Sequence, residues 1–161
     1  MTDAIELEPL DVRHVARLRE LHGQPGVLRW WGPMEHGFPF DEPESQRYAI
    51  VVNGEIAGLV QHGDEEWPVE RHAYVDIFLG EGYTDRGIGT EVLKRLIETL
   101  RTEFGHRRVF IDPYAGNERA IHCYEKVGFR RVGTFSRAAE GLDDELYMEL
   151  MLTDGASRSG R

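Results

Sequence analysis

The stretch NERAIHCYEKVGF, residues 117–129, contains both a helix start and a helix stop. The Asn117 side chain can accept a hydrogen bond from the first helical turn, as residues at this position commonly do. Gly128 tolerates the left-handed conformation that often follows the last turn. We therefore expect a helix over residues 118–127, with Tyr124 one turn before its end.

A second helix start lies upstream, in the segment RGIGT at residues 86–90. The apolar face of the helix that follows consists of Val92, Leu93, Leu96, Ile97, Leu100 and Phe104, before a stop at Gly105. Exposed N–H groups at a glycine-rich helix start can bind phosphate or pyrophosphate, although the same glycines can simply cap a helix. The segment is not a P-loop, because no Gly-Lys-Ser/Thr follows, and it lacks the third glycine of a dinucleotide fingerprint.

Strands fill most of the remaining chain. Asn53-Gly54 favours a type I′ turn and so predicts a β-hairpin. We expect strands over residues 48–52, 55–61, 72–79, 108–111, 129–136 and 145–152, the last two joined by the loop 137–144. Together with the helices, these strands indicate a mixed α/β (α+β) fold, a sheet layered with helices.

The N-terminal part begins with a helix that Asp11 can cap and that runs to about residue 22, before Gly23. Residues 24–45 combine four prolines with several aromatic side chains, which predicts a loop with one short helix. Such a loop can cover a ligand or pack on the core. We interpret residues 1–152 as one domain and residues 153–161 as a frayed tail.

Composition narrows the class of protein. The formal net charge is −10, from 29 acidic and 19 basic residues, so nucleic acid is an unfavourable partner, while a cationic ligand or simple solubility both suit the excess. Cys123 is the single cysteine, and no H-E-x-x-H pair occurs, so we predict neither a disulfide framework nor a metal site. No apolar run reaches membrane-spanning length, and the acidic start differs from a secretory signal. We expect a cytoplasmic protein without a membrane partner, either a monomer or a homodimer.

The order and spacing of the two helix-start motifs resemble the GNAT superfamily of N-acetyltransferases, which pair an R/Q-x-x-G-x-G/A loop with a later N-x-x-A-x-x-x-Y-x-x-x-G-F. The resemblance runs from Tyr48 to Leu152. It implies a central mixed, mostly antiparallel twisted sheet with helices on both faces, whose strand 74–79 splays from the next strand to admit acetyl-coenzyme A. Thr84 stands where the motif usually has Arg or Gln, which puts side-chain help to the phosphate in doubt.

The resemblance also implies cofactor-binding residues. They are Ile77, Phe78 and Leu79 on the strand, Thr84, Asp85, Arg86, Gly87, Ile88, Gly89 and Thr90 at the pyrophosphate, and Asn117, Ala120 and Tyr124 on the later helix. In the family, the tyrosine that matches Tyr124 also gives a proton to the departing thiolate. The alternative is that Tyr124 is a core tyrosine that only packs in the interior.

Amine acetylation needs a proton acceptor, because an alkyl ammonium with a pKa of about 10 is neutral only roughly once in a thousand at pH 7. A carboxylate can accept the proton directly or through water, and can hold the cationic substrate. Asp76, among apolar strand residues, and Asp112, before Pro113, are the candidates. The alternatives are a buried partner of an arginine for Asp76 and a turn residue for Asp112. Cys123 is better explained as a packed thiol than as a nucleophile.

Within the superfamily, the chain is most similar to aminoglycoside 6'-N-acetyltransferases, through Trp30-Trp31-Gly32, Asn53-Gly54-Glu55, Val75-Asp76-Ile77, Asp112-Pro113 and the run from Asn117. The resemblance implies that Asp76 and Asp112 meet ammonium groups of the antibiotic, that Trp30 and Trp31 border the cleft, and that the enzyme confers resistance. Acidic loop residues are candidate walls of that cleft, among them Glu66 and Asp144, with Glu42, Glu44, Asp64, Glu65, Asp143 and Glu145 beside them.

Two other functions remain open at this point. A member of the superfamily could acetylate a protein N-terminus, a lysine or another small amine with the same cofactor residues. A non-catalytic acetyl-coenzyme A-binding module would keep the fold without turnover, although Tyr124 and both carboxylates, Asp76 and Asp112, are present here.

Overall fold

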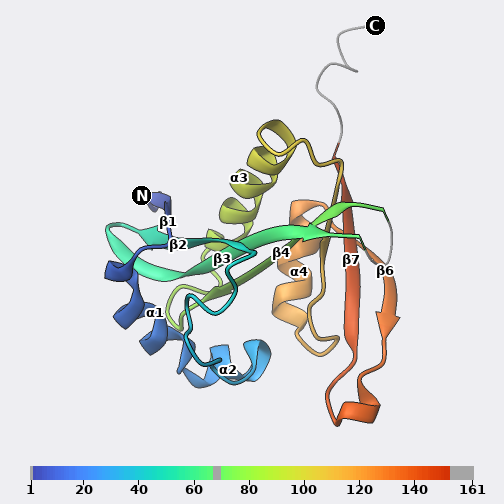
Figure 1. Cartoon of the computed structure of the whole chain (residues 1–161), viewed down its shortest axis with the longest axis horizontal. Coiled ribbons are helices and arrows are strands. Elements are labelled where there is room, and N and C mark those ends of the chain that lie inside the picture. Colours follow the sequence, from blue (N-terminus) through green and yellow to red (C-terminus); the bar gives the residue numbers. More distant parts are fainter. Residues whose placement is uncertain (1, 67–69, 153–161) are drawn as a thin grey trace, which may run out of the picture. The chain divides into compact units, whose positions relative to one another are not determined.

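The computed structural model describes residues 2–66 and 70–152 (Figure 1). Its elements are β1 (Ile5–Pro9), the 3₁₀ turn η1 (Val12–His14), α1 (Val15–His22), α2 (Pro25–Trp31), β2 (Gln46–Val52), β3 (Glu55–Glu65), β4 (His72–Leu79), α3 (Ile88–Thr102), β5 (Arg108–Ile111), α4 (Glu118–Val127), β6 (Arg130–Phe135), the 3₁₀ turn η2 (Ala138–Glu140) and β7 (Glu145–Met151). The frayed tail predicted for residues 153–161 lies outside the described residues.

The strands form one sheet in the order β1-β2-β3-β4-β5-β7-β6. The pairs β1–β2, β2–β3, β5–β7 and β6–β7 are antiparallel, and β4–β5 is parallel. The mixed, mostly antiparallel fold predicted from the sequence is therefore confirmed. By their contacts, the residues group into two compact units: a first unit of residues up to Gly63 together with Asp76–Val92, and a second unit of Asp64–Val75 together with the residues from Leu93 onward.

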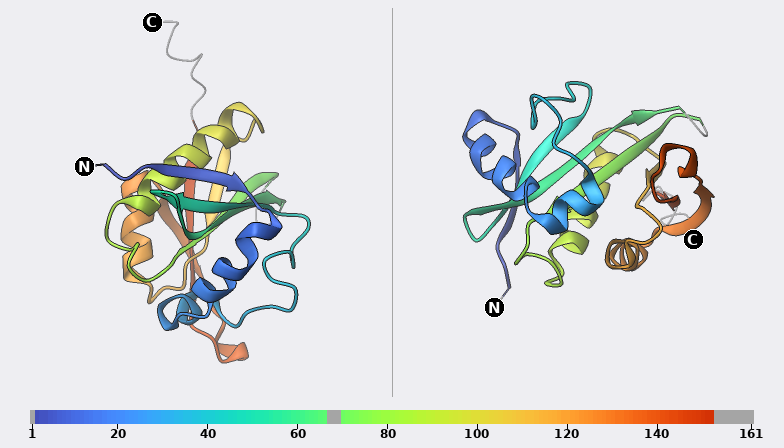
Figure 2. Two further views of the ribbon diagram at one scale, coloured as in Figure 1. Left: turned by 90° about the vertical axis from the view of Figure 1, so that its left-hand side faces the viewer. Right: turned by 90° about the horizontal axis from the view of Figure 1, so that it is seen from below.

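In the first unit, α1 and α2 lie side by side (Figure 2) and share an apolar core. The core residues are Leu18, Leu21, Val27, Phe38, Leu59 and Phe78, each at most 5% exposed. Leu18 and Leu21 recur at helical spacing, so α1 turns both toward this core. The short helix predicted within residues 24–45 is α2, which starts with Pro25 in the first turn, where a missing N–H costs nothing.

The predicted hairpin is present, with Asn53 at φ 52° and Gly54 at φ 82°, as a type I′ turn requires. β1 was not predicted from the sequence. It pairs antiparallel with β2 along its whole length, from Ile5 opposite Val52 to Pro9 opposite Tyr48. This pairing with a distant segment, rather than any local signal, makes residues 5–9 a strand.

The second unit contains β5, β6, β7 and α4, and β6 and β7 run side by side in Figure 1. The predicted limits of α4 are confirmed, because Asn117 Oδ1 accepts from Ala120 N at 3.4 Å and Gly128 follows at φ 121°. α3 ends at Thr102, earlier than predicted, so Phe104 lies beyond the helix and is 39% exposed rather than on its buried face.

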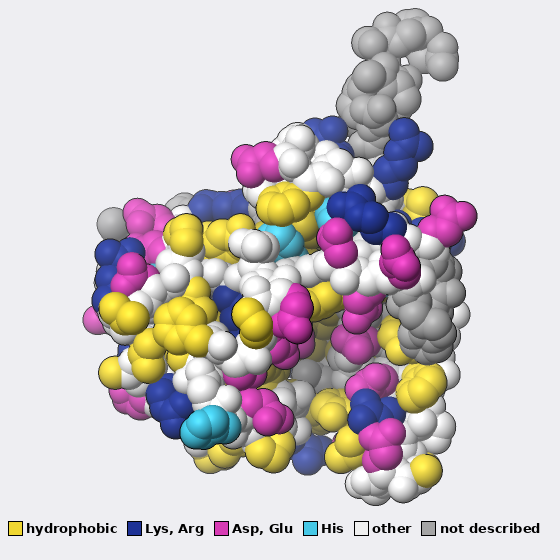
Figure 3. Space-filling model, viewed as in Figure 1, with side chains coloured by type: hydrophobic (Ala, Val, Ile, Leu, Met, Phe, Trp, Pro, Cys, Tyr) yellow, Lys and Arg dark blue, Asp and Glu magenta, His cyan; other side chains and the backbone are white. Residues whose placement is uncertain are grey.

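Charged side chains are scattered over the face of the molecule that Figure 3 shows. On the face that Figure 3 shows, acidic side chains alternate with basic and apolar ones and do not merge into one large patch. The net charge of −10 alone therefore does not locate a binding site on that face. None of the helices within residues 2–66 and 70–152 has the length and apolar character that crossing a bilayer requires.

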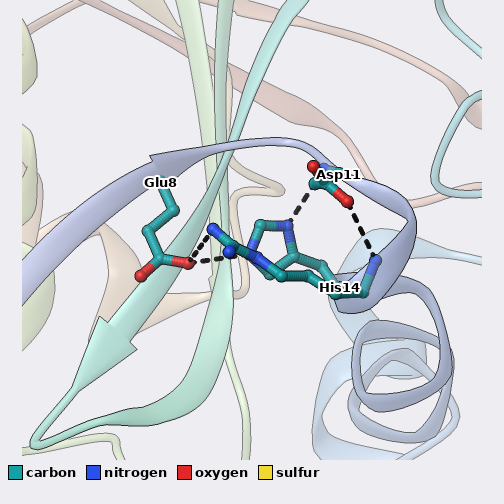
Figure 4. Close-up of polar contacts among 4 residues, drawn as sticks. Glu8, Asp11 and His14 are labelled. Atoms are coloured by element: carbon teal, nitrogen blue, oxygen red, sulfur yellow. Dashed lines mark hydrogen bonds and ion pairs between the residues drawn. The ribbon is translucent and has the colours of Figure 1, made fainter.

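The connection from β1 to α1 is fixed by a reciprocal cap (Figure 4). Asp11 Oδ1 accepts from Arg13 N at 3.2 Å, and Asp11 N donates to His14 Nδ1 at 3.0 Å. Glu8 on β1 contacts both His14 Nε2 and the Arg13 guanidinium at 2.9 Å. The predicted cap at Asp11 is thus confirmed, and it starts the 3₁₀ turn that leads into the helix.

Candidate active site

Asp112 lies in the second unit, where the β5–β7 ladder continues past the end of β5. Ile111 pairs with Met148, and the isolated bridge between Tyr114 and Glu145 has the same register. Leu146 N donates to the Pro113 carbonyl at 2.8 Å, and Ala115 N donates to the Asp144 carbonyl at 2.7 Å.

This register places Asp112 opposite Tyr147. Residues two apart on a strand share a face, so Asp112, Tyr114, Glu145 and Tyr147 extend from one face of the ladder. Diagonal neighbours in such a ladder lie within reach of long side chains. The fold therefore brings the Glu145 carboxylate toward the Asp112 carboxylate.

The pKa of Asp112 is raised from 3.8 to about 7. Surrounding protein atoms, which displace water, are the largest cause, and repulsion from the Glu145 and Glu65 carboxylates adds to it. The Asp112 side chain is nevertheless exposed, so solvent reaches the carboxyl group. A carboxyl group that is crowded by protein yet open to solvent can exchange a proton near neutral pH with a bound molecule.

Arg137 contributes a positive charge beside Asp112 and Glu145. Its Nη1 donates to Glu145 Oε1 at 2.6 Å, and its Nε donates to Glu140 Oε2 at 2.7 Å. The guanidinium acts against the repulsion and lowers the pKa of Asp112. Burial and the carboxylates of Asp112 and Glu145 raise the pKa of Tyr147, so the tyrosine stays protonated beside them.

Asp76 lies in the first unit, on the C-terminal half of β4, where it is half-buried. Its Oδ1 accepts from the backbone N–H of Ile77 at 3.0 Å, and the Ile77 carbonyl accepts from Trp31 Nε1 at 3.1 Å. The Trp31 ring also meets Phe78 edge-on, with the centroids 4.8 Å apart. The backbone N–H and the backbone C=O of Ile77 are thus both hydrogen-bonded.

β4 passes very close to β3 at Gly58. A Cβ atom on Gly58 would lie 2.1 Å from the Phe78 carbonyl oxygen and 3.0 Å from Leu79 Cα. Only a residue without a side chain allows this approach. Gly58 therefore sets the path of the strand segment that contains Phe78 and Leu79.

The loop before α3 has the features of an anion site. Asp85 and Gly87 take positive φ angles of 59° and 77°, and no atom lies within 4 Å of a Cβ built on Gly87. The first N–H groups of a helix have no partner within the helix, and the helix dipole favours an anion there. The segment from Thr84 through Thr90 therefore fits a phosphate or pyrophosphate. The Arg86 side chain points elsewhere, to Asp3 at 2.9 Å.

α4 presents the later motif. Tyr124 is 6% exposed and packs edge-on against Phe129, with centroids 6.2 Å apart. The Asn117 amide oxygen is used as a cap, on the N–H of Ala120. Its NH₂ group remains chemically suited to a carbonyl acceptor.

The remaining predicted residues lie on the surface. Trp30 is half-buried, with the Arg29 guanidinium over its ring at 4.4 Å, while Glu66 and Asp144 are exposed. Glu65 precedes Glu66 and Glu145 follows Asp144, and these two carboxylates raise the pKa of Asp112. Arg137 and Tyr147 were not predicted as site residues, because their link to Asp112 depends on strand register. Within the described residues, no group of three or more His, Cys, Asp or Glu could hold a metal ion.

Comparisons with known proteins show which family has these motifs. A model of the acetyltransferase (GNAT) family matches residues 11–129. The aminoglycoside N(6')-acetyltransferase type 1 of Klebsiella pneumoniae is 27% identical over 154 residues, covering 82% of this chain and 77% of that protein. Spermidine N(1)-acetyltransferase of Escherichia coli (strain K12) is 25% identical over 136 residues, covering 78% of this chain and 73% of that protein.

A solved structure of the aminoglycoside acetyltransferase AAC(6')-Ib, in complex with paromomycin and acetyl-coenzyme A, superposes with a TM-score of 0.77. It is 26% identical, and the superposition covers 98% of both chains. The glycine loop before α3 and the capped helix α4 both fall inside the residues that the family model matches. The chain therefore belongs to the acetyltransferase (GNAT) family and is an N-acetyltransferase with acetyl-coenzyme A as its cosubstrate.

Proposed function

We propose that this enzyme acetylates a primary amine of an aminoglycoside, with the 6'-amino group as the acceptor, by direct transfer in a ternary complex. The observation that carries the proposal is the carboxylate cluster of Asp112, Glu145 and Glu65. Carboxylates crowded in this way are stabilised by a ligand with several ammonium groups. The similarity to an aminoglycoside N(6')-acetyltransferase over most of the chain supports the same substrate class.

In the proposed reaction, Asp112 accepts a proton from the substrate ammonium, directly or through water. The free amine then attacks the thioester carbonyl carbon, and the carbon–sulfur bond breaks. The Tyr124 hydroxyl gives its proton to the departing thiolate, and the excess proton on the acylated nitrogen passes through water to the Tyr124 oxygen. The products are then the amide and the free thiol, and Asp112 releases its proton to solvent. The raised pKa of Asp112 suits its role, since a base works best when its pKa lies near the working pH.

We assign cosubstrate binding to the elements that fit it. The N–H groups of residues 86–90 hold the pyrophosphate at the start of α3. The edge of β4 at Phe78 and Leu79, whose path Gly58 fixes, is assigned to the pantetheine arm, and Asn117 is assigned to the same arm. In this assignment Asp76, Trp30 and Trp31 lie at the acceptor side, and residues 1–152 act as one acetyltransferase domain. The bound cosubstrate supplies the activated acetyl group.

The test is thiol release from acetyl-coenzyme A by the purified protein, with kanamycin, tobramycin, spermidine and a lysine peptide as parallel acceptors. We expect turnover on the aminoglycosides, with kcat/KM reduced about 100-fold or more in Asp112→Asn. Glu103→Gln is the control, because Glu103 is an exposed residue beyond the end of α3 and is not assigned to the site. Mass spectrometry of the product identifies the acetylated amine.

Turnover on the peptide or spermidine alone would exclude the aminoglycoside and retain an amine acetyltransferase. Tight acetyl-coenzyme A binding without thiol release on any acceptor would favour the non-catalytic module. Resistance as the cellular role follows only if expression raises the inhibitory concentration of kanamycin and the Asp112→Asn variant does not.

A further inference from the structure

We propose that Glu145, held by Arg137, is a positioning residue that sets the protonation state of Asp112. Both residues lie beyond residues 11–129, which the family model matches. The kinetic consequence rests on the proposed role of Asp112 as the base, whereas the electrostatic coupling itself does not. Glu145 acts through Asp112 and needs no contact with the reacting atoms.

The ladder geometry carries the first step of the argument. Tyr114 is bridged to Glu145, and the hydrogen bond from Leu146 N to the Pro113 carbonyl, 2.8 Å long, lies between that bridge and the Asp112 position. Backbone pairing on both sides of Asp112 fixes the strand positions of the two carboxylates. The Glu145 side chain is half-buried, so its charge acts through a medium less polar than water.

Arg137 supplies the second step. The hydrogen bond of 2.6 Å from its Nη1 to Glu145 Oε1 fixes the position of the glutamate side chain. A second carboxylate, Glu140, binds the same guanidinium from the other side and anchors it in the β6–β7 connection. The guanidinium therefore both fixes Glu145 and offsets part of its charge, so Glu145 and Arg137 act in opposite directions on the pKa of Asp112.

Other groups also face Asp112 and must be separated from this effect. Glu65 on β3 adds repulsion, and it lies 3.5 Å from His72 Nε2. Tyr147 lies opposite Asp112, and Tyr114 shares its face of the ladder. The pKa of Tyr147 is raised, so this tyrosine adds no charge near neutral pH. Glu149, the other acidic residue of β7 on this face, lies opposite Phe110 and 3.9 Å from the guanidinium groups of Arg108 and Arg130. The repulsion at Asp112 comes from Glu145 and Glu65, and Glu145 is the one on the strand that pairs with Asp112.

The direct test is a carboxyl ¹³C NMR titration of Asp112 in the full-length protein without ligands, assigned by its loss in Asp112→Asn. We expect Glu145→Gln to move the titration midpoint to lower pH by about one pH unit, from one removed charge at an intermediate dielectric constant. Arg137→Gln should move the midpoint to higher pH, and Arg137→Lys, which keeps the charge, should restore it. Glu103→Gln is the control, because Glu103 is an exposed residue just beyond the end of α3, and it should leave the midpoint in place.

An unchanged midpoint in Glu145→Gln would overturn the inference. If Glu145→Gln does not fold, the pair of Arg137 variants decides instead, and an unchanged midpoint in a folded Arg137→Gln would overturn it equally. The acid limb of the kcat/KM profile is then measured with one aminoglycoside for all variants. A limb that follows the NMR midpoint supports both proposals. An NMR shift without a shift of the limb supports the coupling and removes Asp112 as the base.

Discussion

Replacing Asp112 by asparagine should make the protein more stable at alkaline pH while it abolishes efficient catalysis. The pKa of this carboxyl group is about 7 in the folded protein and 3.8 in an ordinary environment. Between these two values the folded chain keeps a proton that the unfolded chain has lost. Stability therefore falls as the pH rises through this window, and the ionised carboxylate destabilises the fold fully above pH 7.

The size of this effect follows from the shift and from the exposure of the side chain. Without solvent screening, a pKa shift from 3.8 to about 7 corresponds to a loss of about 4 kcal/mol of folding stability when the carboxyl group is ionised. Because the Asp112 side chain is exposed, solvent screening reduces the usable part to on the order of 1 kcal/mol. Asparagine has nearly the same shape and no charge, so Asp112→Asn should regain that amount.

The assay is thermal unfolding followed by circular dichroism at pH 8 and at pH 4. We expect the Tm of Asp112→Asn to exceed that of the parent by about 2–4 °C at pH 8 and to match it closely at pH 4. Asp143→Asn, in the exposed loop before β7, should match the parent at both values. A Tm of Asp112→Asn equal to or below the parent at pH 8 would refute the reasoning.

Substitutions at three further positions test the fold. Gly58→Ala places a methyl group 2.1 Å from the Phe78 carbonyl oxygen, so urea unfolding should show a loss of about 3 kcal/mol or more, and a loss below about 1 kcal/mol would contradict the contact. Arg47 Nη1 lies 2.7 Å from Asp41 Oδ1, and Arg47→Met leaves this carboxylate without its partner, so the substitution should cost about 3 kcal/mol of unfolding free energy in urea. An unchanged free energy would mean that the ion pair does not stabilise the fold. Asn117→Ala should cost about 1 kcal/mol by removing the cap on Ala120, whereas Asn117→Asp should restore it.

Local signals in the sequence predicted those elements whose ends depend on one or two residues. Asn117 and Gly128 define α4 because a cap and a left-handed glycine act within a single turn. The strand at residues 5–9 differs, because Ile5 and Leu7 alternate with glutamates over too short a span, and only the pairing with β2 makes it a strand.

The candidate site shows the same division. Asp112 could be singled out from its place after a strand, and Tyr124 from its motif. The effect of Glu145 on Asp112 depends on the register between two strands far apart in sequence. The hydrogen bond from Arg137 to Glu145 depends on the path of the β6–β7 connection. Alternation along each strand indicates which side chains share a face, but only the paired structure shows which of several loop carboxylates reaches Asp112.

Because β7 continues to pair with the segment after β5, the residues that act on the pKa of Asp112 are different from those assigned to binding of the cosubstrate. The elements assigned to the cosubstrate, the loop before α3 and the helix α4, contain neither Glu145 nor Arg137. Under selection for activity at a different acidity, a single change in the β6–β7 hairpin could retune the enzyme and leave affinity for acetyl-coenzyme A intact. A focused library at positions 137 and 145 is therefore an economical starting point for engineering the working pH.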